Sequence, residues 1–190
     1  MGIDIPGETF GFIPSKQWKE KTKGERWYVG DTYNLSIGQG DLLVTPIQLS
    51  MYISSIANGG TLYKPHLVEK VLNSVSGEKS DIQHEIINEV PIKKINIETV
   101  RLGMKDCVEY GACRKLSLLP FSTAGKTGTA QWSNNNKPHA WFTAFAPYDN
   151  PELSITILVE EGEGGSITGA SIAFDFLNWW WKYKQGALDE

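Results

Sequence analysis

Apolar residues recur at helical spacing in three segments of the chain. In the first, residues 46–57, apolar side chains cover much of the circumference, which predicts a largely buried helix. Thr45 is a suitable N-cap with proline after it, and Asn58 followed by two glycines ends the helix. The second segment covers residues 96–110, with Asn96 as its cap, and the third covers residues 166–184.

Alternation of apolar and polar residues predicts three strands in quick succession, at residues 122–131, 139–145 and 153–159. The link between the first two, residues 132–138, carries three consecutive asparagines and is predicted to be a hairpin loop. Three antiparallel strands between helices predict an α+β architecture, in which an antiparallel sheet packs against helices.

The remaining segments have weaker patterns. Residues 1–31 are rich in glycine, proline and lysine, and we expect loop with short extended pieces. Residues 38–44 are predicted to form a glycine-bracketed loop that leads into the first helix. Residues 61–71 are expected to be extended, 73–80 to be a polar turn, and 82–95 to hold short strands.

Composition limits the classes of function. The 190 residues suffice for one domain with a core, and the net charge of -4 argues against a nucleic-acid surface. No segment reaches the roughly 18 apolar residues needed to span a bilayer. Cys107 and Cys113 match neither a redox pair nor a zinc site in their spacing, so we expect unpaired, half-buried thiols, with a disulfide left open.

The segment Lys126-Thr127-Gly128-Thr129 stands out because its strand is built from small residues. Glycine within a strand often marks a place where another backbone approaches closely. Lys126 can meet a carboxylate, and the backbone of such a strand can pair with an extended peptide by strand addition. The alternative is a threonine-rich surface strand with a solvated lysine. Lys-Thr-Gly belongs, together with Ser-x-x-Lys and a Ser-x-Asn type motif, to the signature of penicillin-recognising enzymes.

The companion motifs are weak in this chain. The Ser-x-x-Lys match, Ser76 to Lys79, falls in a polar turn, whereas an activated serine needs a lysine held beside it on a rigid element. The Ser-x-Asn match, Ser133 to Asn135, falls in the predicted hairpin loop. Both are better explained as solvated turn residues.

Other chemistry is not indicated. The histidines His66, His84 and His139 are scattered along the chain, and we expect each to be a surface or packing residue. Glu160, Glu161 and Glu163 form a short acidic loop rather than a metal cage. We therefore expect no cofactor and no metal.

Several ordered blocks of the sequence, beyond the lysine motif, resemble the transpeptidase domain of class B penicillin-binding proteins. The closest type is the cell-elongation subfamily, penicillin-binding protein 2. The blocks are Gly2-Ile3-Asp4-Ile5-Pro6-Gly7-Glu8, Ser36-Ile37-Gly38-Gln39-Gly40, Thr45-Pro46-Ile47-Gln48-Leu49, Ala57-Asn58-Gly59-Gly60, Gly125-Lys126-Thr127-Gly128-Thr129-Ala130-Gln131, and His139-Ala140-Trp141-Phe142.

This resemblance implies a five-stranded antiparallel sheet flanked by helices, the fold shared with serine β-lactamases. It implies an enzyme that cross-links peptidoglycan stem peptides ending in D-Ala-D-Ala through a serine acyl-enzyme, and that β-lactams inhibit. It further implies a location at the bacterial inner membrane with the catalytic domain outside, and a membrane glycosyltransferase of the elongation machinery as partner.

Roles for individual residues also follow from the resemblance. Lys126 would bind the terminal carboxylate and support the serine of the Ser-x-Asn motif, and the hydroxyls of Thr127 and Thr129 would hold the same carboxylate. Gly128 would let the substrate backbone lie close, and the Thr129 N–H would be an oxyanion-hole donor.

In the family's order, the nucleophilic serine, its lysine and the Ser-x-Asn motif lie upstream of Gly2. We therefore expect residues 1–190 to be the C-terminal portion of one transpeptidase domain, inactive alone. Two alternatives share the same strand: a non-catalytic penicillin-binding sensor or binding module, and a D,D-carboxypeptidase or β-lactamase.

Overall fold

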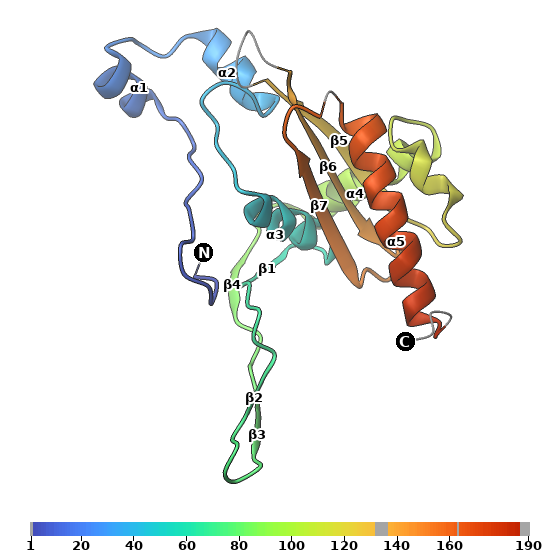
Figure 1. The fold of residues 1–190 in the computed structure, drawn as a ribbon. Helices are drawn as coiled ribbons and strands as arrows, with labels where there is room; N and C mark the ends of the chain where they lie inside the picture. The colour runs from blue at the N-terminus through green and yellow to red at the C-terminus, as the bar shows by residue number, and fades with distance from the viewer. Residues whose placement is uncertain (1, 132–136, 163, 187–190) are drawn as a thin grey trace.

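The computed structural model describes residues 2–131, 137–162 and 164–186. The described chain is an α+β arrangement in which helices flank an antiparallel sheet, and this confirms the predicted fold class (Figure 1). None of the described helices is long and apolar enough to cross a membrane. The elements, in chain order, are α1 (Lys16–Lys23), α2 (Val29–Ser36), α3 (Pro46–Ala57), β1 (Thr61–Tyr63), β2 (Lys70–Leu72), β3 (Lys79–Asp81), β4 (Ile86–Glu89), α4 (Lys94–Glu109), the 3-10 helix Arg114–Leu118, β5 (Ala124–Ala130), β6 (His139–Ala146), β7 (Leu153–Val159), the π-helical turn Gly165–Gly169, and α5 (Ala170–Lys184).

The main sheet has the order β5-β6-β7, with both pairs antiparallel. The three predicted strands are confirmed, with ends that differ by two residues or fewer, while the predicted loop residues 132–136 lie outside the described chain. Of the five-stranded sheet that the resemblance implies, the described residues supply three strands. Strand β5 is an edge strand among them, because β6 pairs with one side of it and no other described strand pairs with the second.

Each face of the sheet packs against its own group of helices. On one face, Phe142 and Ala144 of β6 join a core that includes Ala173 and Leu177 of α5. On the other, Phe145 of β6 and Ala124 of β5 pack with apolar residues of α3 and α4, namely Ile53, Ile56, Ala57 and Met104. The alternation of side chains along a strand explains this division, and it places successive residues of β5 toward different layers.

Helix α3 begins as its sequence predicts. The Thr45 hydroxyl accepts a hydrogen bond from the Gln48 N–H at 3.2 Å, and the Gln48 side chain accepts one from the Thr45 N–H at 2.9 Å. This reciprocal capping box fixes the point where the chain turns from the glycine-bracketed loop into the helix.

The expectation of loop throughout residues 1–31 is wrong, because α1 lies within this segment and α2 begins in it. Ser15 caps α1 by accepting a hydrogen bond from the Trp18 N–H, and Gly24 ends it in a left-handed conformation. Helix α1 is lysine-rich and lacks a continuous apolar stripe, so its periodicity gives little signal. The two caps were the available indication.

Two predicted helix starts are also corrected. Helix α4 begins at Lys94, before Asn96, and has no side-chain cap. The final helix becomes regular at Ala170, because the predicted first turn is the π-helical turn Gly165–Gly169. Gly165 and Gly169 both lie close against β6. Because neither residue has a side chain, the backbone of the turn can contact Trp141 and Phe142 of this strand directly.

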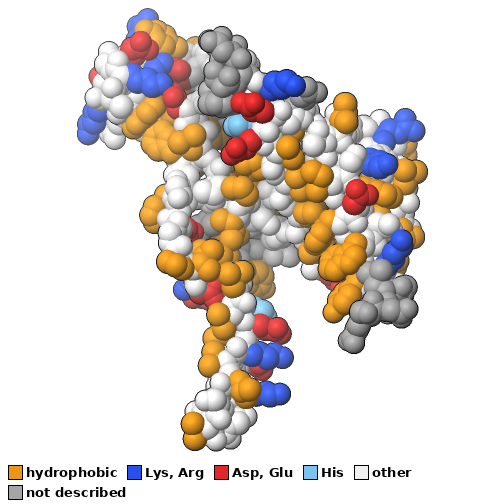
Figure 2. All heavy atoms as spheres, viewed as in Figure 1, with side chains coloured by type: hydrophobic (Ala, Val, Ile, Leu, Met, Phe, Trp, Pro, Cys, Tyr) orange, Lys and Arg blue, Asp and Glu red, His pale blue; other side chains and the backbone are white. Residues whose placement is uncertain are grey.

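Residues 61–90 form an arm that projects from the body (Figure 1). Its two short ladders, β1 with β4 and β2 with β3, are both antiparallel. Only residues 61–63 and 70–72 of the predicted extended segment are strand. Apolar side chains are exposed along much of the arm (Figure 2), and among them Val75 near the tip is 95% exposed.

Candidate functional site

The predicted site strand faces a cavity of about 510 Å³ between the sheet and two helices. Lys126 and Gly128 of β5 stand opposite Thr143 and Trp141 of β6, and all four contribute to the lining. The remaining walls are mostly apolar and come from α3, β5 and α4, at Leu49, Tyr52, Ile53, Ile56, Val100, Gly103, Met104 and Thr127. The cavity is therefore an apolar hollow with a lysine at its sheet side.

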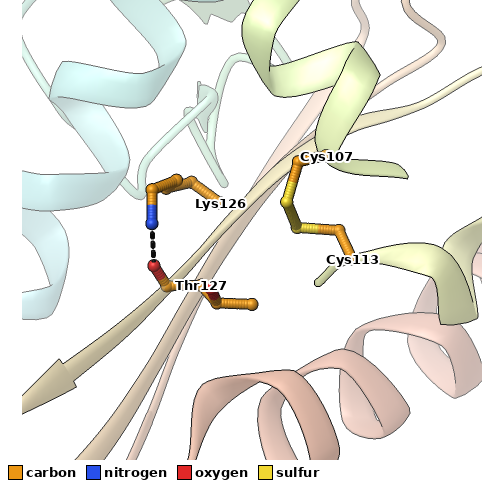
Figure 3. Close-up of a disulfide and its surroundings, with 4 residues drawn as sticks. All are labelled: Cys107, Cys113, Lys126 and Thr127. Carbon is orange, nitrogen blue, oxygen red and sulfur yellow. Dashed lines mark hydrogen bonds between the residues drawn. A yellow bond between two sulfur atoms is a disulfide. The ribbon is translucent and has the colours of Figure 1, made fainter. Parts of the chain in front are cut away.

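Lys126 is exposed, and its Nζ donates a hydrogen bond to the carbonyl oxygen of Thr127 (Figure 3). In the described part of the chain this lysine forms no ion pair. A lysine held only by one backbone carbonyl keeps donors for a second partner, because an ammonium group carries three N–H donors. An anionic group that enters the cavity can therefore accept a hydrogen bond from the Lys126 ammonium group.

Two backbone carbonyls on the outer edge of β5 accept hydrogen bonds from side chains. The Thr127 carbonyl accepts from Lys126 Nζ, and the Thr129 carbonyl accepts from Gln39 Nε2 at 2.8 Å. In an antiparallel ladder, alternate residues turn both backbone groups toward the partner strand and the residues between them turn both away. The two side-chain donors thus mark Thr127 and Thr129 as the residues whose N–H and C=O face the open edge.

The four predicted site residues lie together on this strand but not on one face. Lys126 and Gly128 face the cavity, while alternation directs the side chains of Thr127 and Thr129 toward the face that α5 covers. The two threonines offer their backbone groups to the edge in this structure. No described contact tests the roles that the resemblance implies for their hydroxyls.

Gln39 belongs to one of the blocks that resemble the family, but no role for it was predicted from the sequence. It lies in the loop between α2 and α3, ninety residues before Thr129, and its side chain is half-buried. The available signal was the pair of flanking glycines: Gly38 and Gly40 have φ angles of 73° and 79°, a conformation that favours glycine.

Of the two companion motifs, the one that the structure describes is not at this edge. Ser76 to Lys79 lie at the far end of the arm. The turn there is closed by the backbone N–H groups of Val75 and Ser76, which donate hydrogen bonds to the Asn73 side-chain oxygen. The predicted polar turn over residues 73–80 is confirmed for residues 73–78, whereas Lys79 and Ser80 belong to strand β3. Ser133 to Asn135 lie outside the described residues.

The expectation of unpaired thiols is wrong, because Cys107 and Cys113 form a disulfide (Figure 3). Helix α4 ends just after Cys107, and the chain folds back so that the Cys113 N–H donates to the Cys107 carbonyl at 2.9 Å. This turn brings the two Cα atoms to 5.1 Å, within the range of a disulfide. Spacing along the sequence could not reveal that geometry.

The disulfide lies directly behind the site strand. Cys113 is fully buried, and its Sγ is 3.5 Å from the position that a Cβ would take on Gly125, the residue before Lys126. The bond therefore ties the end of α4 to the layer beneath the start of β5.

The other candidate residues form no metal centre. Among the described residues, no group of three or more histidine, cysteine, aspartate or glutamate side chains could hold a metal ion. His66 and His84 lie near each other on the arm, with ring centroids 5.6 Å apart, and His139 Nδ1 accepts a hydrogen bond from the Glu161 N–H at 3.1 Å. Glu163 lies outside the described chain.

Comparisons with known proteins indicate the family of the chain. The sequence model described as the penicillin binding protein transpeptidase domain matches residues 1–178. The peptidoglycan D,D-transpeptidase MrdA of Haemophilus influenzae is 34% identical over 94% of this chain, and that of Acinetobacter baumannii is 32% identical over 94%. The chain spans 30% and 28% of the length of these two relatives.

Solved structures lead to the same group. The penicillin-binding protein 2 of Pseudomonas aeruginosa, solved in complex with WCK 5153, matches with a TM-score of 0.79 and 34% identity over 93% of this chain and 39% of that chain. The penicillin-binding protein 2 of Helicobacter pylori, solved in complex with MreC, matches with a TM-score of 0.77 and 34% identity over 98% of this chain and 33% of that chain.

Proposed function

Because the chain belongs to the family of penicillin-binding protein transpeptidase domains, we propose that residues 1–190 are the C-terminal, substrate-binding portion of a peptidoglycan D,D-transpeptidase domain. The observation that carries this proposal is the placement of Lys126 on an open strand edge, at the wall of an apolar cavity. The relatives named as peptidoglycan D,D-transpeptidases cover nearly the whole chain and support it.

The ligand in this proposal is a stem peptide that ends in D-Ala-D-Ala, or a β-lactam. Its terminal carboxylate meets Lys126. The resemblance assigns further hydrogen bonds to the hydroxyls of Thr127 and Thr129, whose side chains point toward the other face of β5, so these bonds require the carboxylate to lie at the open edge between the two faces. Its extended backbone pairs with the open edge of β5, as in other cases of strand addition. Gly128, which has no side chain, leaves room for that backbone.

The chemical step requires a serine from outside the described residues of this chain. Its oxygen attacks the carbonyl carbon of the penultimate D-Ala, the terminal D-Ala leaves with the proton on its nitrogen, and an ester to the enzyme remains. An amine of a second stem peptide then displaces the serine and completes the cross-link. The Thr129 N–H, which faces the edge, stabilises the oxyanion in both steps, and loss of one such donor costs about 100- to 1,000-fold in rate.

The disulfide supports a location outside the cytoplasm, since disulfides persist in oxidising compartments. We accordingly place this domain on the outer side of the bacterial inner membrane, attached through other parts of the protein. A membrane glycosyltransferase of the elongation machinery is the partner that this location and family favour.

Acylation by a fluorescent penicillin in the complete protein tests the proposal. Lys126→Ala should lower the second-order acylation rate by about 10- to 100-fold, because a hydrogen bond to a charged group contributes about 1.5–3 kcal/mol. Lys182→Ala is the matched control, since it removes an exposed lysine from α5 on the other side of the sheet. An unchanged rate in Lys126→Ala would remove this residue from the site.

A product assay separates this function from its alternatives. The complete protein, given two stem peptides, should form the cross-linked dimer. Hydrolysed peptide without dimer would indicate a carboxypeptidase. Binding of penicillin with no turnover would indicate a sensor.

A further inference from the structure

Two of the carbonyls that face the open edge of β5, those of Thr127 and Thr129, accept hydrogen bonds from side chains of the same protein. Lys126 donates to Thr127, and Gln39 donates to Thr129. The two donors differ in origin. Lys126 belongs to the strand itself, whereas Gln39 reaches it from a separate loop and lies where a neighbouring strand would run.

The loop that carries Gln39 is fixed on both sides. The Gln39 N–H donates to the Asn34 carbonyl at 2.9 Å, at the end of α2. Beyond it, Asp41 forms an ion pair with Lys23 at 2.7 Å, and Leu43 exchanges two backbone hydrogen bonds with Phe12 at 2.8 and 2.9 Å. These bonds hold the backbone of the loop. A change of the Gln39 side-chain rotamer therefore costs less free energy than a movement of the loop as the carboxamide leaves Thr129.

A ligand strand needs the same place. Neighbouring strands lie about 4.7–4.9 Å apart, and every second residue of an added antiparallel strand directs its N–H at an outward carbonyl of the edge. The carboxamide N–H of Gln39 meets the Thr129 carbonyl at 2.8 Å, as a peptide N–H would. The side chain therefore stands in for a ligand amide.

We propose that Gln39 caps the ligand-pairing edge of β5 when no ligand is bound, and that an extended peptide displaces it by donating its own N–H to Thr129. This inference rests on the proposed function, because it requires a peptide at β5. It makes Gln39 a specificity-determining residue: a ligand with an N–H at this point replaces the lost hydrogen bond, and a ligand with an ester or N-methyl group there does not.

The displacement has a measurable effect on affinity. A net hydrogen bond contributes about 0.5–1.5 kcal/mol, which corresponds to about 2- to 12-fold in a dissociation constant. Gln39→Ala should therefore bind diacetyl-L-Lys-D-Ala-D-Ala about 2- to 12-fold more tightly than the wild type. Gln39→Met, which keeps the length of the side chain without its donor, should show the same gain.

Nuclear magnetic resonance on the full 190-residue chain, labelled with ¹⁵N and ¹³C, provides the test. On titration with diacetyl-L-Lys-D-Ala-D-Ala, the Gln39 side-chain NH₂ resonances should move to the position of a solvated amide. The Thr129 carbonyl should keep its hydrogen-bonded shift. Gln83→Ala, a change to an exposed glutamine on the arm, is the matched control and should leave the affinity unchanged.

The outcomes separate the two proposals. If the peptide shifts Lys126 and Thr127 but leaves the Gln39 amide bonded, or if both Gln39 variants bind more weakly, the capping role is wrong while the proposed function stands. If no resonance of β5 responds to the peptide, the proposed function of this strand is wrong, and the capping role is overturned with it.

Discussion

At the scale of single residues, Gly165 lies where a methyl group has no room. A Cβ on it would be 2.1 Å from the Trp141 carbonyl oxygen and 2.8 Å from that of Gly128. Gly165→Ala should lower the free energy of unfolding by about 1–3 kcal/mol, the usual cost of overpacking. Because Gly128 belongs to β5, the same change should also weaken peptide binding at Lys126.

Urea unfolding with a peptide titration measures both effects. Gly164→Ala is the matched control, because a Cβ on Gly164 meets nothing within 4 Å. If the two alanine variants were equally stable, the close packing of Gly165 against the strand would be contradicted.

The residue scale also shows which parts of the site the sequence could reveal. Lys126 was predicted because its motif is local: four consecutive residues carry the signal. Gln39 was not, because its partner Thr129 lies ninety residues away and only folding brings them together. The Cys107–Cys113 pair was misread for a related reason, since the turn at the end of α4, and not the spacing, decides whether two sulfurs meet.

At the scale of elements, the disulfide couples α4 to the layer behind β5. Reduction should lower the free energy of unfolding by about 2 kcal/mol, because the reduced unfolded chain regains the entropy of a short closed loop. Urea unfolding with and without reductant measures this. The Cys107→Ala, Cys113→Ala double variant should not respond to reductant. Coincident curves for reduced and oxidised wild type would show that the bond contributes nothing.

Helices α1 and α2 are joined by a buried lysine. Lys19 is 6% exposed, and its Nζ bonds both Asp31 carboxylate oxygens at 2.9 and 2.7 Å. The Lys19 hydrogen bond, followed by the Tyr28 N–H, lowers the pKa of Asp31 below its ordinary 3.8, and the bond to Asp31 raises the pKa of Lys19 above its ordinary 10.5.

The signs of these shifts predict the pH dependence. The contribution of Asp31 is complete above pH 3.8 and is lost as the pH falls through the lowered pKa, and that of Lys19 is lost only as the pH rises through the raised pKa. The stability difference between wild type and Asp31→Asn should therefore be constant near neutrality and shrink below pH 3.8. Asp175→Asn, at an exposed position on α5, should show no such trend. A difference independent of acid pH would contradict the pairing.

Helices and strands with a clear periodicity of apolar residues were predicted well, and those without such a periodicity were not. Strand β7 matches its predicted bounds because apolar residues occupy every second position from Leu153 to Val159, and α3 matches because its caps are local. Helix α1 was missed because it is polar around most of its surface, and the start of α5 was misplaced because glycines that pack against β6 replace the regular first turn.

At the scale of the whole molecule, the cavity beside Lys126 is apolar, and α3 and α4 form its walls opposite the sheet. The sheet order and the two cores explain this arrangement: α5 packs against one face, while α3 and α4 pack against the other and leave a hollow over β5 and β6. Sequence patterns predicted the layers but not the hollow, because a cavity depends on how far apart two helices lie. The chain spans 33% of the length of the Helicobacter pylori structure that it matches. The serine in the proposed function is expected in the remainder of such a domain.

If the nucleophilic serine lies outside this chain, the isolated chain should not react covalently with penicillin. Its described Ser-x-x-Lys match lies in the arm, where the Ser76 hydroxyl accepts a hydrogen bond from the Glu78 N–H and Lys79 is exposed in β3. An activated serine needs a base held against it, and this turn holds none. The 190-residue chain should therefore bind a labelled penicillin reversibly without forming a covalent adduct. Intact mass spectrometry checks this after denaturation, with an active penicillin-binding protein as positive control. A mass increase of one penicillin per chain would show that the chain carries its own nucleophile, and peptide mapping would then identify the serine.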